Sequence, residues 1–244
     1  MSRVRYLKRQ AHRLMEIYPM TGEHTLLDAW NQLALGARMA FAQQWMGLAA
    51  GGLPCGSSIL NEQEQIVALG RNHVYDLPEK ATATTPSPLQ YTRVAHAEIN
   101  ALALVPSNSE PQLLTLWTTQ HPCIMCAAAL RFIGIGKVWY IADDPSDVSP
   151  ARDILASRGH IPYEALGERL WWTVSNLLFL YNSAVRQGEA ATNLRKNRGR
   201  YPALVQLVLQ IAKDDALGQS ARAGMALPQA LLPYYPALVH TASN

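Results

Sequence analysis

The segment 118-TTQHPCIMCAAAL-130 carries two cysteines, Cys123 and Cys126, at the start of an alanine-rich stretch. Pro122 stands directly before them and favours a helix that begins here, because the first turn of a helix loses nothing from a missing N–H. Residues i and i+3 share one face of a helix, so the two sulfur atoms can point at one ion. The chain contains a single further cysteine, which argues against a disulfide framework and for a metal role.

The thiolates of such a pair are soft ligands that suit zinc. The start of a helix favours their charged form, because it is the positive end of the helix dipole. Two ligands do not complete a zinc site, and the absence of a second CxxC pair excludes a site made of four cysteines. The missing ligand should therefore be one of seven histidines: His12, His24, His73, His96, His121, His160 and His240.

His96 stands out because it begins a predicted helix and is followed by Glu98 in the tripeptide HAE. Positions i and i+2 point in different directions on a helix, so Glu98 is poorly placed as a second ligand and can instead lie over an open coordination position. Three protein ligands with one open position form a catalytic zinc site, whereas structural zinc normally has four. Each assignment has an alternative. Cys123 and Cys126 can be buried core thiols, His96 a hydrogen-bonded core histidine, and Glu98 a charge at the N-terminus of a helix.

The pattern of apolar residues around these motifs predicts alternating strands and helices. Helices are expected over 21–52, 96–105 and 122–134, and strands over 55–60, 65–72, 112–119 and 137–142. The first two strands, joined by a polar turn, should form a hairpin. The last two flank a helix, so they should be parallel and joined by a right-handed crossover. The fold class expected is α/β, a sandwich with a partly parallel sheet.

Three regions are expected along the chain: a basic N-terminal tail over 1–22, a zinc-binding domain over 23–150 and a helical C-terminal extension over 151–244 that packs on the core. The stretch 170–185, LWWTVSNLLFLYNSAV, is apolar on more than one face, which fits a buried helix or an oligomer interface. It is too short and too rich in Ser, Thr and Asn to span a bilayer, so no membrane is expected as a partner.

The composition limits the class of partner. A net charge of +3 over 244 residues is below the imbalance of a dedicated nucleic-acid binder. The basic run RKNRGR over 195–200 can be a solvated loop or an RNA contact. The basic N-terminus lacks the apolar run of a signal peptide, so a cytoplasmic location is expected.

The combination H-x-E and P-C-x-x-C is a signature of zinc nucleobase deaminases. The segments HAEINAL (96–102) and TLWTTQHPCIMCAAAL (115–130) resemble the cytidine/deoxycytidylate deaminase superfamily, most of all its tRNA adenosine deaminase and guanine deaminase branch. IVALGRN (66–72) resembles the same branch, and the likeness covers roughly 25–145. It implies a three-layer α/β/α sandwich with a mixed, partly parallel sheet. It also implies a zinc ion (Zn²⁺) held by His96, Cys123 and Cys126.

The resemblance further implies an enzyme, a hydrolytic deaminase that releases ammonia from an amino-heterocycle. Glu98 would move the protons, and Asn72, which follows the second strand, would bind the substrate. His121 stands where many relatives carry an acidic residue, and it can line the substrate pocket or lie in a surface loop. Relatives of this branch are commonly dimers, so a homodimer is expected.

The substrate favoured is a small molecule, a nucleobase, nucleoside or related heterocycle, with a purine preferred. One alternative is a tRNA-specific adenosine deaminase that uses 195–200 to contact phosphates. Others are a cytosine- or cytidylate-type deaminase and a non-catalytic binding module that keeps the fold. The presence of Glu98 argues against the last.

Overall fold

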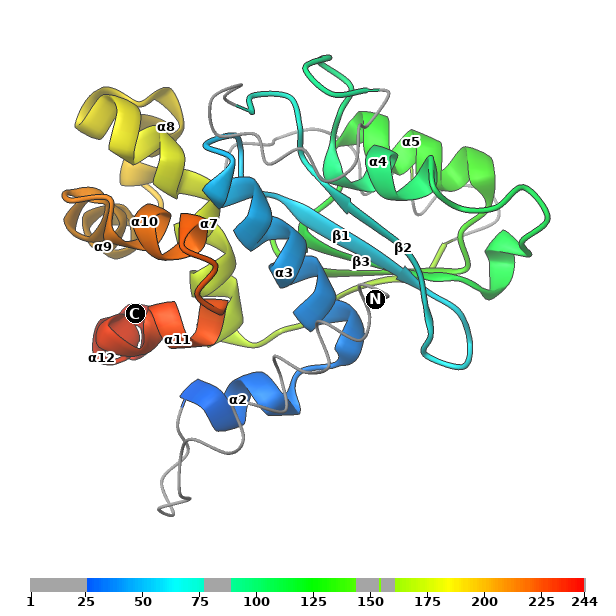
Figure 1. Cartoon of the computed structure of the whole chain (residues 1–244), viewed down its shortest axis with the longest axis horizontal. Helices are drawn as coiled ribbons and strands as arrows, with labels where there is room; N and C mark the ends of the chain where they lie inside the picture. Colours follow the sequence, from blue (N-terminus) through cyan, green and yellow to red (C-terminus); the bar gives the residue numbers. More distant parts are fainter. Residues whose placement is uncertain (1–25, 77–88, 144–153, 155–160, 244) are drawn as a thin grey trace.

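The structure is a computed structural model that describes residues 26–76, 89–143, 154 and 161–243 (Figure 1). The basic tail expected over 1–22, and the first residues of the helix expected over 21–52, lie outside the described residues.

A five-stranded sheet with the order β2-β1-β3-β4-β5 forms the centre of the molecule. The β1–β2 hairpin is antiparallel, β1 also pairs antiparallel with β3, and β3, β4 and β5 run parallel. The mixed, partly parallel sheet is therefore confirmed. Its strands are β1 (Gly56–Leu60), β2 (Ile66–Arg71), β3 (Thr115–Gln120), β4 (Lys137–Ala142) and β5 (Tyr163–Ala165).

Helices cover both faces of the sheet, which confirms the three-layer sandwich (Figure 1). One face packs on α4 (Ala97–Leu102) and α5 (Ile124–Ile133), and the other on α3 (Leu35–Ala49) and α7 (Arg169–Gln187). Because side chains alternate along a strand, Leu116 enters the α4–α5 core while its neighbour Trp117 packs on the α3–α7 side.

Close approach between β2 and α4 depends on a glycine. A Cβ atom on Gly70 would lie 2.2 Å from the carbonyl oxygen of Ala97, the first residue of α4. Only a residue without a side chain allows the helix backbone to pack this closely on the strand. The contact places the start of α4, and with it His96, against the end of β2.

Three local predictions were wrong. The helix expected over 21–52 is two helices, α2 (Leu26–Gln32) and α3, because Ala34 between them has extended backbone angles. Helix α5 has Cys123 as its N-cap, so Pro122 precedes the cap instead of lying in the first turn. The strand expected from 112 begins at Thr115, after a 3₁₀ turn over Pro111–Leu113.

Within the described residues after position 143, the chain contributes one strand and several helices. The strand β5 falls within the region expected to be helical, and it extends the sheet through parallel pairing with β4. The remaining elements are α8 (Thr192–Arg198), α9 (Pro202–Ala212), α10 (Ala216–Arg222), α11 (Leu227–Leu231), α12 (Tyr235–Ala242), and 3₁₀ turns over Gly188–Ala190 and Leu232–Tyr234.

These helices share one apolar core with the sheet. Trp171 of α7 is fully buried against Phe41 of α3, with ring centroids 5.6 Å apart. Most of α7 is buried, so the stretch 170–185 is a core helix in this structure. None of the helices in the described part of the chain combines the length and the apolar character that crossing a membrane requires.

Candidate active site

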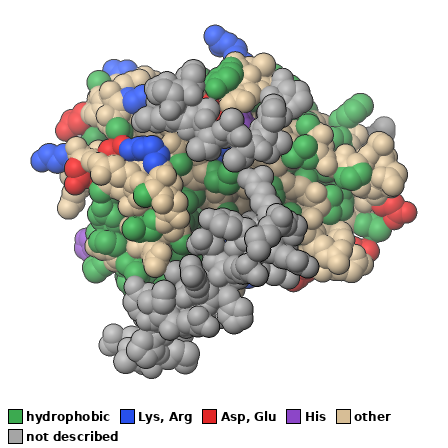
Figure 2. All heavy atoms as spheres, in the orientation of Figure 1, with side chains coloured by type: hydrophobic (Ala, Val, Ile, Leu, Met, Phe, Trp, Pro, Cys, Tyr) green, Lys and Arg blue, Asp and Glu red, His purple; other side chains and the backbone are tan. Residues whose placement is uncertain are grey.

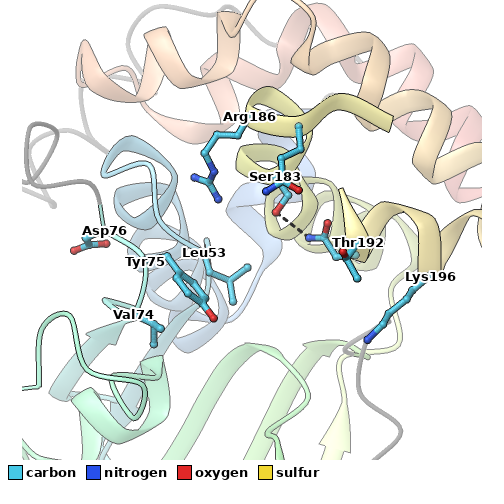
Figure 3. Close-up of a pocket in the computed structure, with 10 residues that line it drawn as sticks. Leu53, Val74, Tyr75, Asp76, Ser183, Arg186, Thr192 and Lys196 are labelled. Atoms are coloured by element: carbon cyan, nitrogen blue, oxygen red, sulfur yellow. Dashed lines mark hydrogen bonds between the residues drawn. The ribbon is translucent and has the colours of Figure 1, made fainter. Parts of the chain in front are cut away.

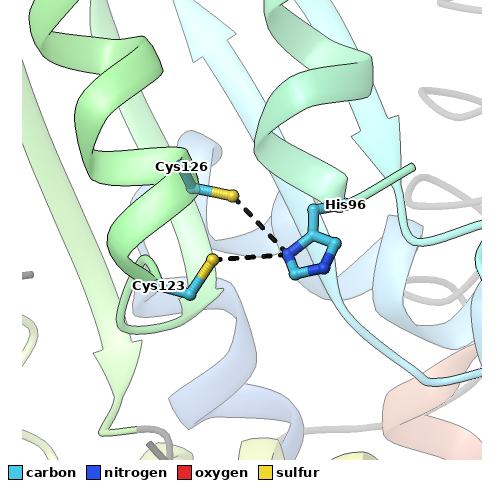
Figure 4. A group of neighbouring side chains, drawn as sticks. All are labelled: His96, Cys123 and Cys126. Carbon is cyan, nitrogen blue, oxygen red and sulfur yellow. Dashed lines mark hydrogen bonds between the residues drawn. The ribbon is translucent and has the colours of Figure 1, made fainter. Parts of the chain in front are cut away.

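The two motifs singled out in the sequence meet at the starts of α4 and α5. His96 is the N-cap residue of α4 and Cys123 that of α5, with Cys126 one turn further on (Figure 4). The Sγ atoms of Cys123 and Cys126 lie 3.5 and 3.6 Å from His96 Nδ1. All three ligand atoms are within 4.8 Å of one another.

This donor set fits zinc. Zinc bonds sulfur at about 2.3 Å and histidine nitrogen at about 2.0 Å, so a tetrahedral arrangement would separate sulfur from nitrogen by about 3.5 Å. The two measured sulfur–nitrogen distances, 3.5 and 3.6 Å, match that spacing. Three donors leave the fourth corner of the tetrahedron for a small ligand, as in catalytic sites.

The two thiols differ in their affinity for protons. The hydrogen bond from Cys126 is the largest of the causes that lower the pKa of Cys123 to about 4, and His96 adds to it against the effect of burial. The pKa of Cys126 is raised, first by its hydrogen bond to Cys123, then by burial and by the nearby carboxylate of Glu98. One thiolate therefore forms readily, and a bound divalent cation would favour the second.

Glu98 lies beside the three ligands with its side chain held on two sides. Thr118 Oγ1 donates to Glu98 Oε1 at 2.9 Å, and Cys126 Sγ donates to Oε2 at 3.3 Å. The residue is 6% exposed, and burial is the main cause of its raised pKa. Burial thus makes this carboxyl group hold its proton more strongly than an exposed glutamate does, which suits a residue that accepts and then donates a proton.

A small cavity of about 70 Å³, the metal-site cavity, adjoins these groups. Five of the six site residues proposed from the sequence line it, and the sixth, Cys126, lies next to His96 with its Sγ 3.6 Å from His96 Nδ1. The lining residues are Leu53, Cys55, Asn72, His96, Ala97, Glu98, Gln120, His121, Cys123 and Phe179.

Asn72 and His121 both lie in this wall. Asn72 is 2% exposed, and its Oδ1 accepts a hydrogen bond from the Val74 amide at 2.9 Å, so its Nδ2 is the group it can offer to a ligand. His121 packs edge-on against Tyr140 with ring centroids 4.8 Å apart. Of the two places that the sequence left open for His121, the structure shows the pocket wall.

Gln120 and Phe179 were not predicted. Gln120 Nε2 donates to Ser175 Oγ at 3.0 Å, and Ser175 Oγ donates to the Thr119 carbonyl at 2.7 Å. Because the one hydroxyl proton of Ser175 is used on Thr119, Ser175 can only accept from Gln120, which fixes the orientation of the amide. Gln120 Oε1 is then a buried acceptor without a hydrogen-bond partner among the described residues.

No sequence signal marked these two residues. Gln120 stands inside the cysteine motif but has no role in ligating zinc, and Phe179 comes from α7, outside the part of the chain that carries the motifs.

Arg71, His73 and Asp76 form a cluster of charged and polar side chains that stabilises the segment after β2. Asp76 accepts from Arg71 at 2.8 Å and contacts the ring of His73 at 3.1 Å, with its side chain fully buried. Burial alone would raise the pKa of Asp76, but the hydrogen bonds from His73 and Arg71 outweigh it and lower the pKa. The cluster holds the backbone that carries Asn72.

Comparisons with known proteins agree with this geometry. Residues 31–142 match the family model of the cytidine and deoxycytidylate deaminase zinc-binding region. Human deoxycytidylate deaminase is 28% identical over 102 residues, which are 39% of this chain and 57% of that protein. The mouse enzyme is 27% identical over 106 residues, 40% of this chain and 59% of its own length. The chain thus spans little more than half the length of these relatives.

Among solved structures, one from a study of tRNA:A34 deaminases is 23% identical over 52% of this chain and 93% of its own, with a TM-score of 0.41. Guanine deaminase from Nitrosomonas europaea is 19% identical over 68% of this chain and 96% of its own, with a TM-score of 0.44.

Proposed function

Because residues 31–142 belong to the cytidine and deoxycytidylate deaminase superfamily, we propose that this chain is a zinc-dependent hydrolytic deaminase of an amino-heterocycle of the nucleobase type. One observation carries the proposal. Two sulfur donors and one nitrogen donor lie close together, and a buried carboxyl group stands beside them at one small cavity. His96, Cys123 and Cys126 would hold the zinc.

Zinc bound there would supply Lewis acidity, which makes water a competent nucleophile at neutral pH. In the overall reaction one water molecule replaces the amino group on a ring carbon, and ammonia leaves. The protein must move one proton from water to a ring nitrogen and a second to the departing amine.

Glu98 is the group that can carry these protons. Thr118 donates to its Oε1, and its Oε2 lies 3.3 Å from Cys126 Sγ, so the carboxyl group is next to the residues that would hold the zinc. Its raised pKa matches a group that must be ionised to accept a proton and protonated to donate one.

Two amide side chains can orient the ring. Asn72 offers donors through its Nδ2, and Gln120 offers an acceptor through its Oε1. A buried polar group left unpaired costs free energy, so a ligand that presents a donor to Gln120 would be selected over one that does not. The small volume of the metal-site cavity favours one heterocyclic ring system as the part that enters.

Two substrate classes have support. The motifs that resemble the tRNA adenosine and guanine deaminase branch favour a purine, whereas the curated relatives are named for deoxycytidylate, so a cytosine derivative is the second candidate.

A tRNA substrate would need a basic surface near the cavity. Figure 2 shows lysine and arginine side chains over α8, and the exposed Arg198 is already paired with Glu189 at 2.9 Å. The basic run at 195–200 therefore has part of its charge neutralised, which favours a small substrate.

Ammonia release from a panel of substrates tests the proposal. The panel holds guanine, adenine, cytosine, their nucleosides and monophosphates, and a tRNA anticodon stem-loop, each with zinc-loaded protein. We expect release from one heterocycle class, abolished in Glu98→Gln and retained in Glu62→Gln, which changes an exposed glutamate in the β1–β2 turn. Zinc content measured in each sample should be equal. A zinc-loaded wild-type protein that releases no ammonia from any member would contradict the proposal.

A further inference from the structure

A second, larger cavity lies beside the metal-site cavity. It has a volume of about 740 Å³ and opens between the segment after β2 and helices α7 and α8 (Figure 3). We call it the outer cavity. Leu53 lines both cavities, so the two spaces adjoin.

Two elements lead from one cavity to the other. Asn72 lines the metal-site cavity, and Tyr75 on the same segment lines the outer cavity. On α7, Phe179 lines the first and Arg186 the second. An α-helix advances about 1.5 Å per residue, so Arg186 lies about 10 Å along the axis from Phe179. This separation is comparable to the distance from the ring of a nucleotide to its 5′-phosphate.

The lining of the outer cavity carries a positive charge. Arg186 and Lys196 are exposed to it, and Figure 3 shows them extending from α7 and α8. Asp76 is the acid among the described lining residues, and it is already engaged by Arg71 and His73. The two cations therefore have no acid in the described lining left to neutralise them.

The donors of these two side chains are available. Lys196 makes no ion pair or hydrogen bond with any residue that the structure describes. Arg186 Nη1 donates to the Gly51 carbonyl, which anchors the guanidinium, and its other N–H groups make no hydrogen bond to a described residue. Ser183 Oγ accepts from Asn193 Nδ2 at 3.0 Å, so its own proton can be donated into the cavity that it lines.

We propose that the outer cavity binds the phosphate group of a nucleoside monophosphate whose ring occupies the metal-site cavity, with Arg186 and Lys196 as its cationic contacts. The inference rests on the proposed function, which supplies the ring. Arginine and lysine are the side chains that bind phosphate most strongly, through charge-assisted hydrogen bonds. The extension, which lies outside the family match over 31–142, would thus set the substrate class.

Calorimetric titration of zinc-loaded Glu98→Gln protein separates this inference from the proposed function, because binding is then measured without turnover. The ligands are the nucleosides adenosine, guanosine and deoxycytidine, and their 5′-monophosphates. We expect at least one monophosphate to bind about tenfold or more tightly than its nucleoside, as one charge-assisted contact allows. Adding Lys196→Gln should reduce this preference about tenfold, and Arg186→Gln should do the same.

The matched control is Lys213→Gln, an exposed lysine after α9 that lies outside both cavities. Arg186→Lys is the second variant at this position, for the case that Arg186→Gln does not fold. It keeps the positive charge, so it should retain most of the preference for the monophosphate. Equal affinity for nucleoside and monophosphate in the unsubstituted background would overturn the inference, as would a preference unchanged in Lys196→Gln. Binding of an anticodon stem-loop alone would overturn the mononucleotide assignment. Monophosphate binding without ammonia release from any substrate would contradict only the proposed deaminase activity.

Discussion

Gln120 and Ser175 are joined by a hydrogen bond of 3.0 Å between Nε2 and Oγ. Gln120 is the last residue of β3, beside the zinc motif, whereas Ser175 belongs to α7 in the C-terminal part. The same helix places Phe179 in the wall of the metal-site cavity. Helix α7 therefore helps to build the candidate active site, although the family match ends at residue 142.

Replacing Ser175 with alanine should weaken substrate selection without loss of zinc. The variant removes the acceptor that orients Gln120 and the donor to Thr119. A hydrogen bond contributes about 0.5–1.5 kcal/mol, so kcat/KM for the preferred substrate should fall between about twofold and tenfold. Steady-state kinetics would show this, with Ser107→Ala, at an exposed loop position, as the control. Unchanged kinetics in both variants would mean that the orientation of Gln120 does not matter for the substrate.

Removal of zinc should lower the melting temperature. The three ligands join the starts of α4 and α5, and an ion that binds only the folded state stabilises it. We expect about one zinc ion per chain by elemental analysis, because the ligand set makes one site. A strong chelator should remove it and lower the melting temperature of the wild type. Cys123→Ser should be purified without zinc and should melt at the same temperature with or without chelator, whereas Cys55→Ser should keep the metal.

Acid should remove the contribution of Asp76 to stability. Its pKa is lowered in the folded protein, so its stabilising effect is present above the unfolded pKa near 4 and is lost as the pH falls through the folded pKa. Breaking a buried ion pair from one side costs about 3–5 kcal/mol. Asp76→Asn should therefore lower the free energy of unfolding in urea by about this amount at pH 7, and by less below about pH 4. A difference between wild type and variant that stays constant from pH 7 to pH 3 would contradict the assignment.

Local pattern predicted most of the fold, and motif spacing predicted which three candidate metal ligands lie close together. The hairpin, the helix after His96 and the strand over Lys137–Ala142 follow from apolar periodicity and turn residues, which are properties of neighbouring positions. Strand β5 has only three residues and is held by backbone pairing with β4, so no pattern of its own marks it. The break between α2 and α3 leaves the apolar spacing almost unchanged and was missed for the same reason.

In the candidate site, too, the residues marked by a local motif were predictable and those placed by long-range contacts were not. His96, Glu98, Cys123 and Cys126 are recognisable because their spacing matches the signature H-x-E and P-C-x-x-C. The contact of Gln120 with Ser175 joins residues 55 positions apart, and it exists only because α7 packs on the end of β3. Such contacts depend on the tertiary fold and leave no periodic trace in the sequence.

Gly70→Ala tests whether the close contact between β2 and α4 positions the zinc ligands. The added Cβ would lie 2.2 Å from the Ala97 carbonyl oxygen and 2.4 Å from the Ala101 nitrogen, both backbone atoms, so the helix must move. Overpacking of this kind costs about 1–3 kcal/mol. Because His96 and Glu98 stand at the start of α4, the shift should weaken zinc retention during dialysis as well as lower the melting temperature. The matched control is Gly199→Ala, where the added Cβ meets nothing within 4 Å and should leave both quantities near wild type. A Gly70→Ala protein that melts lower but holds zinc as firmly as the control would show that the packing of α4 stabilises the fold without setting the geometry of the metal site.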